Sequence, residues 1–381
     1  MFDCSCLYSD NYVNRKNKML VKLEKHGVAH VRLKEKEFDG FGIYELCQNI
    51  YYIINTYKKA CKSIVITCNE FNPTDKLTYI LFETILFDLI INRSYDVKFR
   101  VKECKTNIMT DGMRDSTLNY HYIYAQNVDK YQKKFKFEQN RIHFRRLFTK
   151  EQSEGSGISS LLGELKTFFI TSQLGKSNTD QLANVISELV DNVGEHTESD
   201  CLVDIDISES PYFKAGEGDV EYLAVNTVVL NFGGKCLCDD MRKKIQNHYF
   251  ENSNRYNTVE CAYNNHKLQF GKEYNEEDFF NVVSFQDEIS GRKGETTTGG
   301  TGLTQLIKSL ESNAEEHGCY VLSGKQGLFF HPSFLEYNDD NWLGFNEKRD
   351  FITEIPNKEI LLRSKTFLRG TGYNFTLVYR R

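Results

Sequence analysis

The chain has 381 residues, with 48 Lys and Arg against 53 Asp and Glu and a net charge of −5. This length is too great for one ordinary hydrophobic core, so two domains are expected. Hydrophobic residues make up 40% of the chain, which argues against wholesale disorder, and the nearly balanced charge gives no overall attraction to nucleic acid or to an anionic membrane.

The first segment, residues 1–25, is expected to be an N-terminal extension. It has no apolar run typical of a signal peptide, and no stretch of the chain reaches the ~18 uncharged apolar residues of a membrane helix. The 11 cysteines include no C-x-x-C pair and no zinc-finger spacing. Reduced thiols in a cytoplasmic protein that does not enter the membrane are therefore expected.

Residues 26–110 are expected to form a small α/β domain. Strand patterns at 27–33, 62–68 and 95–104 alternate with helical patterns at 42–61 and 77–91. The alternation predicts a partly parallel sheet. This order of elements resembles STAS-like domains, the regulatory modules of sigma-factor control.

Residues 111–157 are expected to be a basic linker or helix. Its most basic parts, "KYQKKFKF" and "RIHFRRLFTK", are interpreted as solvated surface, so no strong nucleic-acid signal remains.

Residues 158–381 are expected to form an α+β sandwich, in which helices pack on a mixed, mostly antiparallel sheet. Helices are predicted at 158–172, from about 177, and at 238–248, 275–287 and 303–316. Strands are predicted at 201–208, 222–232 and 370–380, and a hairpin at 319–331.

The stretch "ISELVDNVGEHT", residues 186–197, combines a buried stripe with a polar one. Positions four apart share a helix face, so Glu188 and Asn192 are expected side by side at the rim of the core. A carboxamide oxygen can ligate Mg²⁺, and a neighbouring carboxylate can orient or deprotonate a water. This pair is a candidate site for metal-assisted attack on a phosphate.

A second motif, "ETTTGGTGLTQLIKSL", residues 295–310, is a glycine-rich run that leads into a helix. Glycines allow backbone N–H groups to approach phosphate oxygens, and the helix N-terminus adds its positive dipole end. The residues of this run expected to lie at such a phosphate are Thr298, Gly299, Gly300, Thr301, Gly302 and Leu303.

Together the two motifs resemble the GHKL superfamily of Bergerat-fold ATP-binding proteins. "ELVDNVGEH" looks like its N-box, and "GGTGL" like its G2 box, in the expected order. Between them the family has a strand ending in Asp-x-Gly-x-Gly, which reads the adenine. Here Asn231 stands in place of that Asp, Gly233 fits the first glycine, and the second glycine is displaced to Gly234. An Asn carbonyl can accept the same hydrogen bond without the charge.

The resemblance implies roles for individual residues. Asn192 would hold Mg²⁺ across the phosphates, and Glu188 would activate water. Asp191 would support the metal shell or face solvent, and His196 would touch a phosphate or be structural. A lid over the triphosphate would place Arg292 and Lys293 near the γ-phosphate, unless they belong to a plain exposed loop.

The sequence therefore predicts an ATPase that binds ATP and Mg²⁺ and acts as a nucleotide-driven conformational switch in a regulatory, stress or defence system, with a protein partner or a second copy as its target. A serine/threonine kinase of the anti-sigma type and a nucleotide-binding scaffold with little turnover are the alternatives. A sensor histidine kinase is disfavoured, because neither His121 nor His143 is followed by the acidic residue typical of a phospho-accepting histidine.

Overall fold

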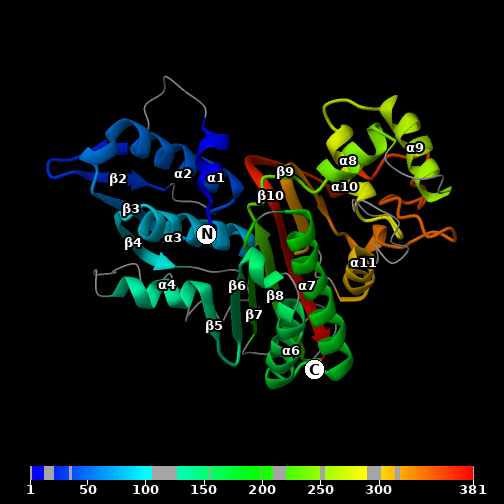
Figure 1. Ribbon diagram of the computed structural model, residues 1–381, viewed down its shortest axis with the longest axis horizontal. Coiled ribbons are helices and arrows are strands. Elements are labelled where there is room, and N and C mark those ends of the chain that lie inside the picture. Colours follow the sequence, from blue (N-terminus) through cyan, green and yellow to red (C-terminus); the bar gives the residue numbers. More distant parts are fainter. Residues whose placement is uncertain are drawn as a thin grey trace.

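The computed structural model of the protein describes residues 2–12, 21–33, 37–104, 127–153, 156–197, 199–208, 220–248, 254–289, 302–313 and 318–380. These residues form eleven α-helices and two β-sheets (Figure 1). One sheet is mixed and belongs to the first part of the chain, whereas the other is antiparallel and belongs to the second part.

The first sheet has the order β1-β2-β3-β4. Its strands are β1 (Val21–Leu23), β2 (Val28–Arg32), β3 (Ser63–Phe71) and β4 (Asp96–Cys104). β2, β3 and β4 are parallel, and β1 is antiparallel to β2. The crossovers are α2 (Gly40–Tyr52) and α3 (Lys76–Phe87), and α1 (Ser5–Asn11) packs on α2. The partly parallel α/β arrangement expected for this region is confirmed.

Both crossover helices begin at an aspartate. Asp39 accepts hydrogen bonds from the backbone N–H groups of Phe41 and Gly42, and Asp75 accepts one from Thr78 at 2.8 Å. Each side chain satisfies donors that a helix start leaves without an intrahelical partner. These caps define where the two helices begin.

The second sheet has the order β5-β6-β7-β8-β10-β9, and every neighbouring pair is antiparallel. Its strands are β5 (Phe137–Gln139), β6 (His143–Phe148), β7 (Cys201–Ile207), β8 (Tyr222–Asn231), β9 (Tyr320–Phe329) and β10 (Leu361–Arg380). β5 and β6 come from the segment that the sequence pattern assigned to a linker. Their charged residues are not a solvated surface throughout, because Arg145 is 1% exposed.

β9 folds back on itself at Gly324, which has a φ of +67°. The N–H of Phe330 donates to the carbonyl of Cys319 at 2.9 Å, so the two ends of the strand lie side by side. This is the geometry of the hairpin expected at 319–331. A side chain at the turn glycine would impose backbone strain, which explains a glycine at this position.

The remaining described helices come from residues 128–313 of the chain. They are α4 (Val128–Lys136), α5 (Lys150–Ser153), α6 (Ser156–Thr171), α7 (Lys176–His196), α8 (Asp239–Gln246), α9 (Asn254–Lys267), α10 (Glu276–Val283) and α11 (Gly302–Asn313). α6, α7 and α11 pack together, and their apolar side chains share one core with inward residues of β7 and β8. α9 was not predicted, because its polar sequence carries little apolar periodicity.

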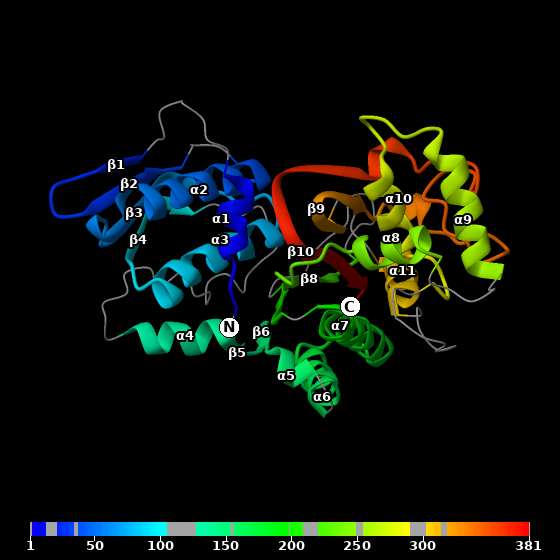
Figure 2. The ribbon, with the colours of Figure 1, turned by 45° about the horizontal axis from the view of Figure 1, so that its top comes forward.

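α3 lies between the two sheets (Figure 2). All of its side chains from Lys76 to Phe87 are buried. Side chains along a strand of the second sheet alternate between its two faces. On β7, Val203 and Ile205 belong to the core shared with α6 and α7, whereas Leu202 belongs to the core around α3. The second sheet is thus covered on both faces, by helices of its own part and by the first part of the chain.

No helix in the described ranges combines the length and the apolar character needed to cross a membrane.

Candidate functional site

α7 carries the first of the two motifs, and its apolar stripe is buried as expected. The side chains concerned are Leu182, Ile186, Leu189 and Val193, each at most 8% exposed. The polar residues Glu188, Asp191 and Asn192 are only partly buried. Because Glu188 and Asn192 are one turn apart, they lie on the same side of the helix. His196 is the last residue of α7, and its side chain is outside the described part of the structure.

Asn231 is the last residue of β8 and is 1% exposed. Its side-chain oxygen accepts a hydrogen bond from the N–H of Thr371 at 2.9 Å, and its amide nitrogen donates to the hydroxyl of Ser199 at 3.4 Å. These contacts fix the orientation of the amide. An amide oxygen has two lone pairs, so one acceptor position remains after the bond from Thr371.

The turn after Asn231 touches the end of α7. A Cβ added to Gly233 would lie 2.4 Å from the Cβ of Thr197, the residue that follows α7. Such a distance is far below van der Waals contact, so only glycine allows the two segments to approach this closely. The structure therefore brings the end of the first motif together with the strand turn that the family resemblance assigns to adenine recognition.

The second motif is divided by the limits of the described residues. Gly302 is the first residue of α11, and Leu303 packs against the core that α11 shares with α7. α11 and α7 are in contact. The predicted contact residues Arg292, Lys293, Thr298, Gly299, Gly300 and Thr301 lie outside the described residues.

The chain on either side of residues 290–301 is joined by hydrogen bonds. The Thr304 hydroxyl, in the first turn of α11, donates to the Asp287 carboxylate at 3.0 Å. Arg255 donates to the Asp287 carbonyl at 2.7 Å, and its guanidinium lies 3.8 Å from the centre of the Trp342 ring. Arg255 was not predicted to lie near this segment, because it belongs to α9, a helix with no recognisable motif. These contacts hold Asp287 against the first turn of α11 and against α9.

A second group of polar residues lies on the opposite face of the second sheet, against α3. The Lys76 ammonium is 2.6 Å from the Asp204 carboxylate and also donates to Asp206. All three side chains are at most 4% exposed. Lys76 belongs to α3, and the two aspartates belong to β7, so this contact joins the two parts of the chain.

Arg145 extends the same cluster to a second residue of α3. Its guanidinium donates to Asp204 and to Glu83, both of which are at most 1% exposed. His143, beside it on β6, has its Nε2 3.2 Å from Asp204. A buried carboxylate requires such partners, since an isolated buried charge is very costly. His143 was considered above only as a histidine-kinase candidate, and no sequence motif indicates the cluster, because its members are far apart in the chain.

His143, Asp204 and Asp206 have the donor atoms of a metal site and lie within 4.8 Å of one another. However, Lys76 already contacts both carboxylates, and Arg145 contacts Asp204. A divalent ion would have to displace an ammonium group and then sit beside a guanidinium, which opposes its binding. The chemistry of the cluster is therefore that of a buried ion-pair network that joins the two parts of the chain.

Burial opposes the charging of His143, but the carboxylates of Asp204 and Asp206 outweigh it and raise the pKa of the imidazole. A pKa raised by folding contributes stability that is fully present below the unfolded value of about 6.5 and is lost as the pH rises through the folded value. For Asp204, burial is outweighed by Arg145, Lys76 and His143, so its pKa is well below the usual range. Its contribution is present above the unfolded pKa and is lost as the pH falls through the folded one.

The free energy of unfolding is therefore expected to fall as the pH rises above about 6.5, through the folded pKa of His143. Urea unfolding from pH 5 to 9 would measure this fall. The variant His143→Gln is expected to show a smaller fall over the same range. An identical slope in the variant would show that His143 is not the group responsible.

Comparison of the chain with family models, with curated proteins and with solved structures finds no match.

Proposed function

We propose that the second part of the chain is a GHKL-type module that binds ATP with Mg²⁺ and hydrolyses it. One observation carries the proposal. α7 places the partly buried Glu188 and Asn192 beside its buried apolar stripe, touches the turn at Gly233 through Thr197, and packs against α11, which begins at Gly302. Three segments with separate sequence motifs therefore belong to one neighbourhood of the fold.

Each segment has a chemical role in this proposal. The Asn192 side-chain oxygen ligates Mg²⁺, which needs hard oxygen ligands and neutralises charge on the phosphates. Glu188, one turn away, accepts a proton from the attacking water. The backbone N–H groups at the start of α11 bind phosphate oxygens, supported by the helix dipole. The remaining acceptor position of Asn231 receives the adenine amino group.

The proposed output is a change in how the two parts of the chain contact each other. The nucleotide would bind on the α7 side of the second sheet, and α3 of the first part covers the opposite face through the Lys76 and Arg145 ion pairs. A shift of α7 on ATP binding would move β7, which carries Asp204 and Asp206, and would thereby change these contacts.

Phosphate release from ATP, measured in parallel with transfer of the labelled γ-phosphate to protein, tests the proposal. Release of inorganic phosphate that requires Mg²⁺ is expected, without labelled protein. Labelled protein would indicate the kinase alternative. ATP binding without either product would indicate a scaffold, and the absence of binding would contradict the proposal as a whole.

A further inference from the structure

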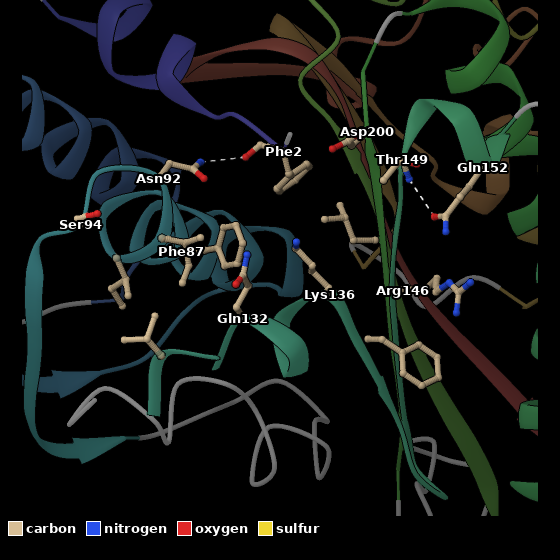
Figure 3. Close-up of a pocket in the computed structure, with 15 residues that line it drawn as sticks. Phe2, Phe87, Asn92, Ser94, Gln132, Lys136, Arg146, Thr149, Gln152 and Asp200 are labelled. Atoms are coloured by element: carbon tan, nitrogen blue, oxygen red, sulfur yellow. Dashed lines mark hydrogen bonds between the residues drawn. The ribbon is translucent and has the colours of Figure 1, made fainter. Parts of the chain in front are cut away.

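A cavity of about 710 Å³ lies between the first part of the chain, α4 and the edge of the second sheet (Figure 3). This volume is within the range of small-molecule sites, which are mostly apolar with a few polar groups. The apolar wall of this cavity comes from segments far apart in the sequence, namely Phe2, Phe87, Ile90, Ile91, Val128 and Leu147.

α4 divides its side chains between the protein core and this cavity. Tyr131 and Phe135, one turn apart, are fully buried in the core around α3. Val128, Gln132 and Lys136 follow one another at intervals of four residues and line the cavity. Positions four apart share a helix face, so these three side chains form one stripe along the cavity, apolar at Val128 and polar at Gln132 and Lys136.

The polar groups of this stripe are available for a ligand. Across the described residues, neither the Gln132 amide nor the Lys136 ammonium has a hydrogen-bond or ion-pair partner. Figure 3 shows both side chains on the α4 side of the cavity, across from Thr149, Gln152 and Asp200. On the opposite wall the side-chain oxygen of Gln152 already has a partner, because it accepts a hydrogen bond from the N–H of Thr149 at 3.2 Å.

The charge balance favours an anion. Among the described lining residues, Asp200 is the one acidic side chain, against the cations of Lys136 and Arg146, and it accepts a hydrogen bond from the N–H of Lys150 at 3.3 Å. Arg146 lies 3.6 Å from Glu164 and is therefore partly neutralised. Lys136 forms no ion pair within the described ranges, and it stands at the end of a mostly apolar surface.

We propose that this cavity is a binding site for a small organic anion, with an apolar body against Phe87, Ile90 and Leu147 and an acidic end group at Lys136. The Gln132 amide donates a second hydrogen bond to the same end group. The site is separate from the proposed nucleotide site, because the described residues of its walls include none from α7 or α11. The bound anion would contact both parts of the chain, since Phe87 belongs to α3 and Leu147 belongs to β6.

Two fluorescent probes of nearly equal shape test this site in the full-length protein. Anilinonaphthalene sulfonate has an apolar aromatic body and an anionic end, and phenylnaphthylamine is its neutral counterpart. One sulfonate molecule is expected to bind per chain. The variant Lys136→Met is expected to weaken sulfonate binding about tenfold, the loss of one charge-assisted hydrogen bond, and to leave the neutral probe unchanged.

Lys133→Met is the matched control, because Lys133 lies on α4 but does not line the cavity, and its sulfonate affinity should equal that of the wild type. Val128→Trp and Ile91→Trp, from different walls, should each exclude both probes. Variants are compared only where their urea midpoint equals the wild-type value. Equal sulfonate affinity in Lys136→Met and Lys133→Met, or probe binding that survives both tryptophan variants, would overturn the proposal.

Discussion

Replacing Lys76 by methionine is expected to lower the free energy of unfolding by about 3–5 kcal/mol. The Lys76 ammonium lies between the carboxylates of Asp204 and Asp206, and all three groups are buried. Methionine has a similar length but no charge, so Asp206 would keep a buried carboxylate without its cation. Urea unfolding of the wild type and the variant at one pH measures the difference.

Two further variants separate the ion pair from general effects of the substitution. Lys98→Met removes an exposed ion pair with Asp96, whose side chains are 44% and 49% exposed, and is expected to cost less than about 1 kcal/mol. Lys76→Met combined with Asp206→Asn removes both charges, and comparison with each single variant, Lys76→Met and Asp206→Asn, is expected to give a coupling energy of about 1–3 kcal/mol between the two changes. Strict additivity would show that Lys76 does not act through Asp206.

The largest expected effect on activity belongs to Glu188. Changing Glu188 to alanine is expected to lower the rate of phosphate release from ATP by about 10²–10⁴-fold, the usual contribution of a general base. ATP binding should remain close to the wild-type affinity, because in the proposed site Glu188 contacts the attacking water and not the nucleotide. Phosphate release at saturating ATP, together with equilibrium binding, checks both expectations.

Asn184→Ala is the matched control for this experiment. Asn184 is exposed on α7 one turn before Glu188, so its loss tests whether any polar-to-alanine change on this helix lowers turnover. It should hydrolyse ATP at the wild-type rate. Full activity in Glu188→Ala would show that Glu188 is not the general base. The proposal that the protein binds ATP would then depend on the binding measurement alone.

The elements with strong periodicity were predicted well. The apolar run at 77–91 was expected to be a buried helix, and α3 begins at Lys76 and is buried on all sides. The helix carrying Glu188 and Asn192 was predicted together with its buried stripe. Both predictions depend on local patterns, and a local pattern is what a single sequence contains.

The contacts between distant segments could not be predicted. β5 and β6 were assigned to a basic linker, because the charge of Arg145 indicates a surface position unless its partners are known. Those partners, Glu83 and Asp204, are 62 and 59 residues away in the sequence. The covering of the second sheet by α3 is likewise a tertiary arrangement, and no periodicity within either element specifies it.

The candidate site shows the same division. Asn231 and Gly233 were identified from their place between two motifs, but the contact of Gly233 with Thr197 required the fold. Arg255 was missed, because its role depends on Trp342 and Asp287, which are distant from it in sequence. The cavity beside α4 was missed for the same reason, since its described walls come from five stretches of the chain, at residue 2, 87–94, 128–137, 146–152 and 200.

Titration calorimetry of the protein with ATP and Mg²⁺, for the wild type and for Asn192→Ala, tests the central claim most directly. If Asn192 holds the metal across the phosphates, the wild type will bind one ATP per chain, and the variant will lose the Mg²⁺-dependent heat while Asn184→Ala retains it. A wild-type protein that binds no ATP, or an Asn192→Ala variant that binds it with unchanged affinity and the same dependence on Mg²⁺, would contradict the account.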